Sequence, residues 1–124
     1  DISQRISIVY SLDVVSAIMK TIEAGPRVHG LSLNIAGREQ PTMREFARMI
    51  AEACGEEEPS FDESKRSFFP SVDFGPIDSS KAQDILGWRP TEMKDWIRRT
   101  TAWNDVPANA AYTMAFVHAN SYLA

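Results

Sequence analysis

Residues 78–90, DSSKAQDILGWRP, restrict what this chain can fold into more than any other segment does. Asp78 can accept hydrogen bonds from the first amides of a short helix. Gly87 suits the position after the last turn of that helix, because glycine adopts the left-handed conformation without a Cβ penalty. Trp88 then places a large apolar side chain directly behind the helix, and Pro90 restricts the direction in which the chain leaves. The segment therefore predicts a short helix that a buried tryptophan holds against a core.

The length and composition of the chain are those of one ordinary soluble domain. Its 124 residues are 44% hydrophobic and 24% charged, which allows a modest core. The net charge is −4, and the sequence has no basic stripe of the kind that binds nucleic acid. No run reaches the roughly 20 uninterrupted apolar residues of a membrane span. We therefore expect neither nucleic acid nor a membrane as a partner.

The cysteine content and the N-terminal residues bear on where the protein is found. Cys54 is the single cysteine, so it cannot form an intrachain disulfide, and it fits a reducing compartment. The N-terminal residues, DISQRISIVY, lack the basic and apolar regions of a secretory signal, and they lack a start methionine. We expect a cytoplasmic protein whose chain is truncated or processed at this end.

Two short runs that are rich in β-branched and aliphatic residues indicate strands, with a helix between them. Residues 5–10, RISIVY, form the first run, and residues 31–35, LSLNI, form the second. Ser11 offers an N-cap for the helix, which is expected to end at Gly25. Four apolar residues follow one another in it at helical spacing: Val14, Val15, Ile18 and Ile22.

The second half of the chain is predicted to be mainly helical. Thr42 and Glu45 have the spacing of a capping box, which begins a helix that ends at Gly55. Another helix begins at Thr91 or Glu92. The apolar face of the helix that begins after Thr42 is expected to contain Met43, Phe46, Met49, Ile50 and Ala53. The inward face of the helix that begins at Thr91 or Glu92 is expected to contain Met93, Trp96, Ile97 and Thr100. Residues 59–61 are compatible with a short edge strand. This is a small α/β arrangement with too few strands for a complete nucleotide-binding sheet.

Four segments, in this order along the chain, resemble the C-terminal part of the NAD-dependent epimerase/dehydratases, which are extended short-chain dehydrogenase/reductases. They are SIVYSLDVV at residues 7–15, LNIAG at 33–37, the capped helix at 41–55, and DSSKAQDILGWRP at 78–90. Trp96 and Trp103 are similar to tryptophans of the family's final helix. The resemblance covers roughly residues 5–104, and it concerns the lobe of the enzyme and not its substrate.

The resemblance implies the fold class and the division of labour in a larger parent enzyme. The chain would be α/β, the small C-terminal substrate-binding lobe of an extended Rossmann-type enzyme, in residues 1–104. The family's N-terminal lobe binds NAD or NADP at a glycine-rich turn, and it catalyses hydride transfer with a Tyr-x-x-x-Lys pair. The sequence contains neither pattern. We therefore expect no catalytic residue and no cofactor bound by this chain alone.

The partners that the resemblance implies are the dinucleotide-binding lobe and a small-molecule substrate. In this family the substrate is commonly a nucleotide sugar. The other substrate class is a related polyol or keto compound, because enzymes of this family oxidise their substrate transiently. The parent would then be an epimerase, a dehydratase or a reductase.

Two candidate substrate-binding residues belong to the first predicted strand. In many family members an arginine near Arg5 holds the substrate's phosphates, a role that suits the guanidinium fork. With Asp13 aligned on the family's aspartate, however, Ile6 occupies the usual arginine position. Arg5 would then be a solvated charge at the strand edge. Tyr10 falls where the family has His or Tyr, and it either lines the cleft between the lobes or packs in the core.

Three further candidates lie in an irregular segment, residues 64–76. Arg66 and Phe69 belong to a loop of the kind that often carries binding residues. The family often has an R-x-G-D pattern here, and with Asp73 as its aspartate, Pro70 stands where the arginine would be. Arg66 is the candidate to replace that arginine. The alternatives are that Phe69 packs against the dinucleotide-binding lobe and that Asp73 has a structural role.

The sequence offers no chemistry that would make the chain an enzyme by itself. Cys54 is expected near the C-terminal end of a helix, where the helix dipole does not lower the pKa of a thiol, and no base is near it in sequence. His29 and His118 are far apart and lack cysteine or acidic partners at metal spacing. We therefore expect neither a nucleophile nor a metal site.

A non-catalytic interaction or assembly module, derived from the same lobe, is the alternative function. The tail of residues 105–124 suggests this function, because Asp105 is the only Asp, Glu, Lys or Arg in it. The tail is expected to be either helical or disordered. A helix over residues 110–123 would be apolar nearly all round, and such helices are usually buried. It would cover the surface that the dinucleotide-binding lobe leaves, or dock on a second copy in a homo-oligomer.

Overall fold

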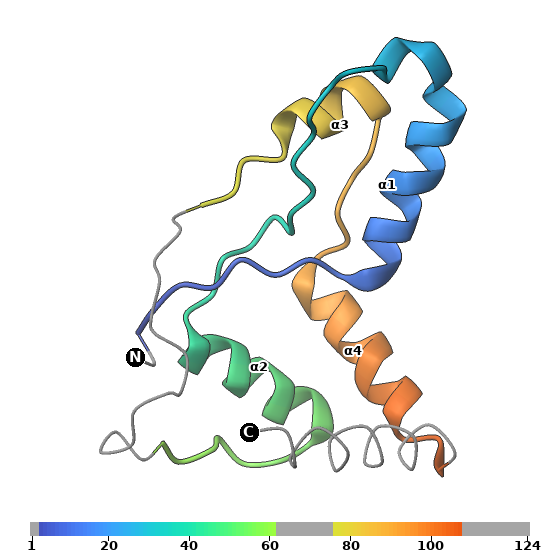
Figure 1. Cartoon of the computed structure of the whole chain (residues 1–124). Coiled ribbons are helices and arrows are strands. Elements are labelled where there is room, and N and C mark those ends of the chain that lie inside the picture. The colour runs from blue at the N-terminus through green and yellow to red at the C-terminus, as the bar shows by residue number, and fades with distance from the viewer. Residues whose placement is uncertain (1–2, 62–75, 108–124) are drawn as a thin grey trace, which may run out of the picture.

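The computed structural model describes residues 3–61 and 76–107, and these residues form short helices joined by long loops (Figure 1). In chain order the elements are α1 (Ser11–Ala24), the 3-10 helix η1 (Gly25–Val28), α2 (Met43–Cys54), α3 (Ser80–Leu86) and α4 (Met93–Asn104). Residues 62–75 and 108–124 lie outside the described residues, and they include most of the predicted irregular segment and of the predicted tail.

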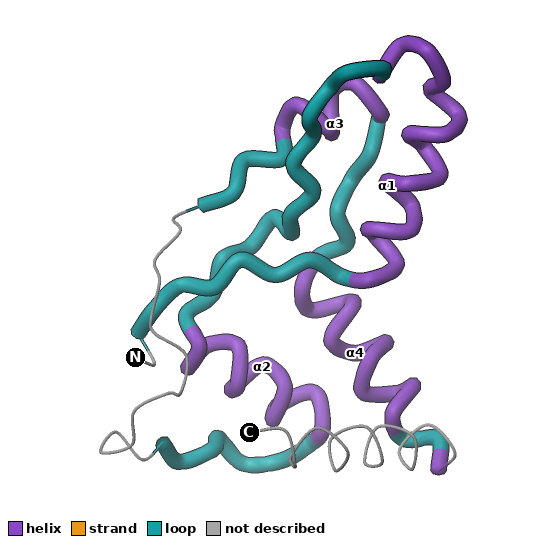
Figure 2. The backbone as a smooth tube through the Cα atoms, in the orientation of Figure 1, coloured by secondary structure: helices purple, strands orange, loops and turns teal. Residues whose placement is uncertain are grey.

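The two segments expected as strands are loops, so this part of the prediction is wrong for the described residues (Figure 2). The first segment pairs with residues 37–42 and not with residues 31–35. The pairing consists of one isolated antiparallel bridge between Arg5 and Thr42. The amides of Ile6, Met43 and Gly37 donate to the carbonyls of Pro41, Gln4 and Ile8, at N–O distances of 2.9, 3.1 and 2.9 Å. Two paired segments without a third are marginal as a sheet, which explains why the β-branched residues form no ladder here.

The segment expected as a short edge strand, residues 59–61, is also a loop. Its last residue returns to α2, where the guanidinium carbon of Arg44 lies 4.9 Å from the centroid of the Phe61 ring. This is a cation–π contact, which a side chain makes without any backbone pairing. The loop is therefore anchored to a helix rather than to a sheet edge.

The start of α1 differs from the prediction by one residue. Tyr10, with an extended backbone, is the N-cap residue, and Ser11 is already helical. No side chain caps this end of α1. The Tyr10 carbonyl instead accepts the amides of Asp13 and Val14. Gly25 ends the helix with a φ of 55°, a conformation that glycine adopts without strain.

The predicted boundaries of α2 and the predicted end of α3 are confirmed, whereas the N-cap residue of α3 is Ser79 and not Asp78. In α2 the Thr42 hydroxyl accepts the Glu45 amide, and the Glu45 carboxylate accepts the Thr42 amide, which completes the capping box. Gly55 and Gly87 follow α2 and α3 in the left-handed conformation. Asp78 contributes at the start of α3 as expected, because its carboxylate accepts the Ser80 amide at 2.8 Å.

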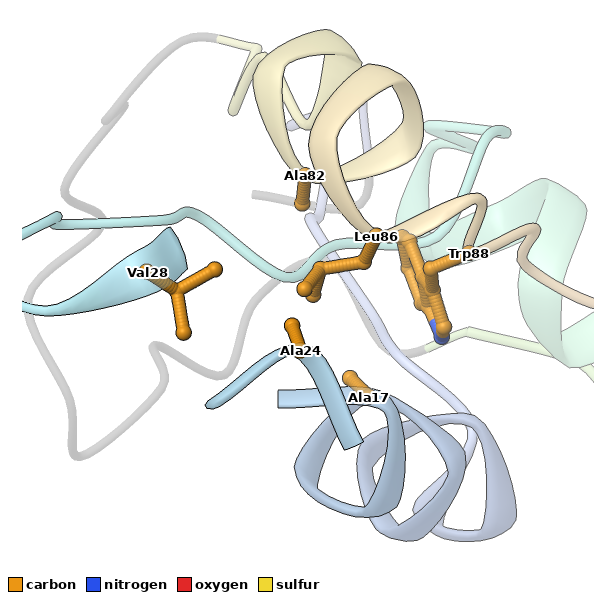
Figure 3. Close-up of a cluster of buried hydrophobic side chains, with 6 residues drawn as sticks. All are labelled: Ala17, Ala24, Val28, Ala82, Leu86 and Trp88. Atoms are coloured by element: carbon orange, nitrogen blue, oxygen red, sulfur yellow. The ribbon is translucent and has the colours of Figure 1, made fainter. Parts of the chain in front are cut away.

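Two small apolar clusters form the interior. The first joins α1, η1 and α3, and its buried side chains are Ala17, Ala24, Val28, Ala82, Leu86 and Trp88 (Figure 3). Trp88 is fully buried, which confirms that it anchors the segment to the core. The second cluster joins α2 and α4 around Met93, Trp96 and Ile97, with Phe46, Met49 and Ala53 of α2 packed against them.

Only part of each predicted apolar face is buried. Met93, Trp96 and Ile97 of α4 lie inside, whereas Thr100 is exposed. On α2, Met43 and Ile50 are exposed at the edge of the predicted face. On α1 the structure buries Asp13, Ala17 and Ala24, while Val15, Ile18 and Ile22 are more than half exposed. The spacing therefore identifies the helices correctly, but it does not identify the side of α1 that packs.

Candidate functional site

Asp13 joins two segments that are far apart in the sequence. Its carboxylate is buried and accepts the amide and the hydroxyl of Thr91, each at 2.7 Å. Its backbone carbonyl accepts the indole N–H of Trp88 at 2.9 Å. We call Asp13, Trp88 and Thr91 the Asp13 junction. It fixes the start of α1 against the chain that leads from α3 into α4.

The hydrogen bonds that Asp13 accepts restrict the positions of Trp88 and Thr91 relative to the start of α1. Hydrogen bonds to an ionised carboxylate are shorter and stronger than neutral ones. They also remove the penalty that an unpaired carboxylate would pay inside the protein. The partners of Asp13 were not predicted from the sequence. The signal that could have found them is the position of Asp13 in the first turn of a predicted helix, where an acidic residue is favoured.

A second carboxylate lies close to the N-terminal end of α4. Glu39 Oε1 accepts the amide of Met93, the first residue of α4, at 3.2 Å. Among the described residues, Glu39 Oε2 is a buried oxygen without a hydrogen-bond partner. Asp13 binds the Thr91 amide two residues earlier. These carboxylates accept the Thr91 and Met93 amides, and a phosphate group placed beside them would meet negative charge.

The second motif segment packs against both the first and the last. Asn34 Nδ2 donates to the Asp78 carbonyl at 3.2 Å, and Lys81 Nζ donates to the Ser32 carbonyl at 3.2 Å. Gly37 lies so close to the Ile8 carbonyl that a Cβ at this position would overlap the oxygen. The segments of residues 7–15, 33–37 and 78–90 are therefore in direct contact.

Arg5 lies at the exposed edge of the chain pairing. Its guanidinium donates to the Gln40 carbonyl at 2.7 Å. Hydrogen bonds from the Thr42 amide and hydroxyl hold the pKa of Glu45 below its ordinary value of 4.5, and the positive charges of Arg5 and Arg48 lower it further. The structure thus gives Arg5 a backbone partner and an acidic neighbour. Its substrate-binding role stays a prediction.

Tyr10 packs on the second cluster. Its ring stacks on that of Trp96, with centroids 5.8 Å apart and planes inclined by 9°. The side chain is half-buried, and its substrate-binding role stays a prediction. Arg5 is directed to Gln40 and Tyr10 to α4, so the two candidates have different neighbours. Arg66, Phe69 and Asp73 lie outside the described residues, and their substrate-binding roles stay predictions.

Two hollows lined by described residues were not predicted from the sequence. The first measures about 140 Å³ and lies between α2 and α4; its lining is Met49, Glu52, Ala53, Lys94, Ile97 and Arg98. It is smaller than the roughly 300–1,000 Å³ of typical ligand pockets. The second measures about 310 Å³ and lies between α1 and residues 28–35. Neither hollow is lined by Arg5 or Tyr10.

Over residues 3–61 and 76–107, no three His, Cys, Asp or Glu side chains gather as metal ligands would. Within the same ranges no helix is long and apolar enough to cross a bilayer. Cys54 is exposed at the end of α2.

No protein-family model matches the chain, and a search of the curated proteins found no match.

Proposed function

We propose that this chain is the C-terminal substrate-binding lobe of an NAD(P)-dependent enzyme of the epimerase/dehydratase type, with the α/β fold of such a lobe. The lobe acts together with a dinucleotide-binding lobe on a sugar nucleotide or on a related polyol or keto compound. It supplies walls and anchors for the substrate. The partner lobe supplies the cofactor, the proton-transfer groups and the hydride acceptor.

The observation that supports this proposal most is the Asp13 junction. The resemblance rests on segments that are separate in the sequence, and Asp13 and Trp88 belong to two of them. These two residues are 75 positions apart, and the Trp88 indole N–H donates to the Asp13 carbonyl. Thr91, 78 positions from Asp13, binds its carboxylate. Motifs of one functional lobe are expected to meet in this way.

Arg5 is the described residue best suited to hold a phosphate-bearing substrate. It is exposed, and its planar guanidinium can bind a phosphate through two parallel hydrogen bonds. The negative charge of the Glu45 carboxylate interacts with Arg5 and partly offsets the positive charge of the guanidinium. A diphosphate would therefore need at least one more cation, and Arg66 is the residue proposed for that role.

The first prediction concerns ligand binding by the chain. We expect a sugar nucleotide such as UDP-glucose, dTDP-glucose or GDP-mannose to shift the backbone amide resonances near Arg5 in a ¹⁵N-labelled sample. Arg5→Ala is expected to weaken this binding by about tenfold, which corresponds to one lost charge-assisted contact.

The control for this titration is Arg27→Ala in η1, an exposed arginine at the other end of α1, which should leave the affinity unchanged. NAD⁺ alone is expected to cause no shifts. Shifts with NAD⁺ but with none of the sugar nucleotides would contradict the proposal, because the chain would then behave as a cofactor lobe.

An assembly module is the second candidate function, and one described feature favours it. Large apolar residues of α1 are exposed. A helix that is apolar on several sides is normally buried against a partner.

A further inference from the structure

Helix α1 exposes a continuous row of large apolar side chains. We call this row the α1 outer face; it consists of Leu12, Val15, Ile18, Met19 and Ile22. Each of these residues is between 52% and 68% exposed. Successive residues of an α-helix are turned by about 100°, so all five side chains fall within one third of the helix circumference. The row is a single surface and not a set of scattered exposed residues.

The rest of α1 is built differently. The side toward the core carries small residues, Ala17 and Ala24, which let α3 approach closely. The charged residues of α1 avoid the outer face: Asp13 is buried in its junction, Lys20 lies on the far side of the helix, and Glu23 lies at the rim of the row. A partner could therefore cover the outer face without burying a charge, which would be costly.

The apolar surface extends beyond the helix. The 310 Å³ groove beside it is lined by Ile18 and Ile22 from the outer face. Leu31, Leu33 and Ile35 line it from the neighbouring loop. α1 lies at one edge of the molecule; η1 continues from its C-terminal end, and α3 packs against its inner side (Figure 1). The outer face and the groove thus form one apolar surface at that edge.

The spacing along the outer face is that of a surface that pairs with another helix. Leu12, Val15, Met19 and Ile22 follow at intervals of three, four and three residues, the pattern of a helix–helix seam. This pattern reads the same in both directions. An antiparallel second α1 would therefore bring Leu12 against the partner's Ile22 and Val15 against the partner's Met19. This reciprocity is what a two-fold symmetric interface requires.

We propose that the α1 outer face is the dimer interface of this protein, with an antiparallel α1 of a second copy as its occupant. The row exposes on the order of 500 Å², which is the size of apolar patches that often have a function. A pair of such faces buries about 1,000 Å², the lower limit for a specific interface. The dimer is consequently a reversible one that forms as the protein concentration rises. This inference does not depend on the proposed enzymatic role.

The test is sedimentation equilibrium of the full 124-residue chain over a wide concentration range. We expect the average mass to rise with concentration from 13.9 kDa towards twice that value. Met19→Glu places a charge in the middle of the seam and is expected to weaken dimerisation by at least about tenfold. Met43→Glu is the matched control, since Met43 is an exposed methionine at the first position of another helix.

A cross-linking experiment tests the antiparallel orientation. In a Cys54→Ser background, Val15→Cys and Met19→Cys variants are mixed and oxidised. An antiparallel pair predicts that the disulfide between the two different variants predominates, because positions 15 and 19 face each other. A parallel pair would instead join two copies of the same variant.

Three results would overturn the inference. One is a chain that stays monomeric at every concentration, which would leave the outer face to another occupant such as the dinucleotide-binding lobe. Another is a Met19→Glu variant that keeps its fold by circular dichroism and dimerises as strongly as the Met43→Glu control. The third is predominant cross-linking between identical Val15→Cys chains.

Discussion

At the scale of single residues, the Asp13 carboxylate links the start of α1 to Thr91, which directly follows the last motif segment. Asp13→Ala leaves the Thr91 amide and hydroxyl without their partner, and an unsatisfied group of this kind costs about 1–3 kcal/mol. We expect urea unfolding to show a loss of about 2 kcal/mol. Asp84→Ala, an exposed aspartate on α3, should change the free energy of unfolding by less than about 0.5 kcal/mol.

A double-mutant cycle separates the Asp13–Thr91 contact from general packing. Thr91→Val removes the hydroxyl that donates to Asp13 Oδ1. If the contact is worth what its geometry implies, the combined loss will be smaller than the sum of the single losses by at least about 0.5 kcal/mol. Strict additivity would show that the two side chains do not stabilise each other.

Gly37 is the residue at which backbone closeness matters most. A Cβ there would overlap the Ile8 carbonyl, to which the Gly37 amide donates. We expect Gly37→Ala to cost roughly 2–3 kcal/mol, as overpacking does. Gly30→Ala is the comparison, because Gly30 has open space around it and only its φ of 74° opposes a side chain, at a cost of about 1 kcal/mol. Thermal unfolding that ranks Gly30→Ala as the more damaging change would contradict this account.

At the scale of elements, the helix caps introduce a dependence of stability on pH. Capping hydrogen bonds hold the pKa of Glu45 below 4.5 and that of Asp78 below 3.8, the bond to Ser80 being the main cause for Asp78. A carboxylate with a depressed pKa stabilises the folded state above its unfolded pKa, and this contribution is lost as the pH falls through the folded pKa. We therefore expect the chain to lose stability as the pH falls below about 4.5.

Glu45→Gln isolates the contribution of α2 to this acid dependence. Glutamine can still accept the Thr42 amide in a capping box, but it does not titrate. The variant should be less stable than the wild type near pH 7, and the difference should shrink below pH 4.5. Chemical denaturation at a series of pH values measures it. A difference that stays constant with pH would show that the Glu45 charge does not stabilise the cap.

The helices also show how far periodicity predicts packing. On α4 the expected inward residues Met93, Trp96 and Ile97 are buried, because the helix has one apolar side. On α1 large and small apolar residues lie on different sides, and periodicity alone does not choose between them. The core took the side with Ala17 and Ala24, because small residues allow α1 and α3 to come close around Trp88 (Figure 3).

At the scale of the whole molecule, the described residues form two small clusters connected at the Asp13 junction. One cluster lies around Trp88 and the other around Trp96, and Thr91 lies between them in the chain. The exposed α1 outer face is the largest apolar surface that this arrangement leaves uncovered among the described helices. The dimer interface that we propose on α1 and the substrate anchor that we propose at Arg5 use different residues, so each can fail without the other.

The sequence by itself determined the features that depend on neighbours within a few residues. The capping box at Thr42, the left-handed glycines after α2 and α3, and the order of the helices are of this kind, since their hydrogen bonds join residues close in the chain. Only the tertiary structure decided which side of α1 is buried, that residues 5–10 form no ladder, and that Asp13 binds Thr91. Each of these three features depends on a segment that is distant in the sequence. A local sequence pattern does not indicate which distant segment will pack against it.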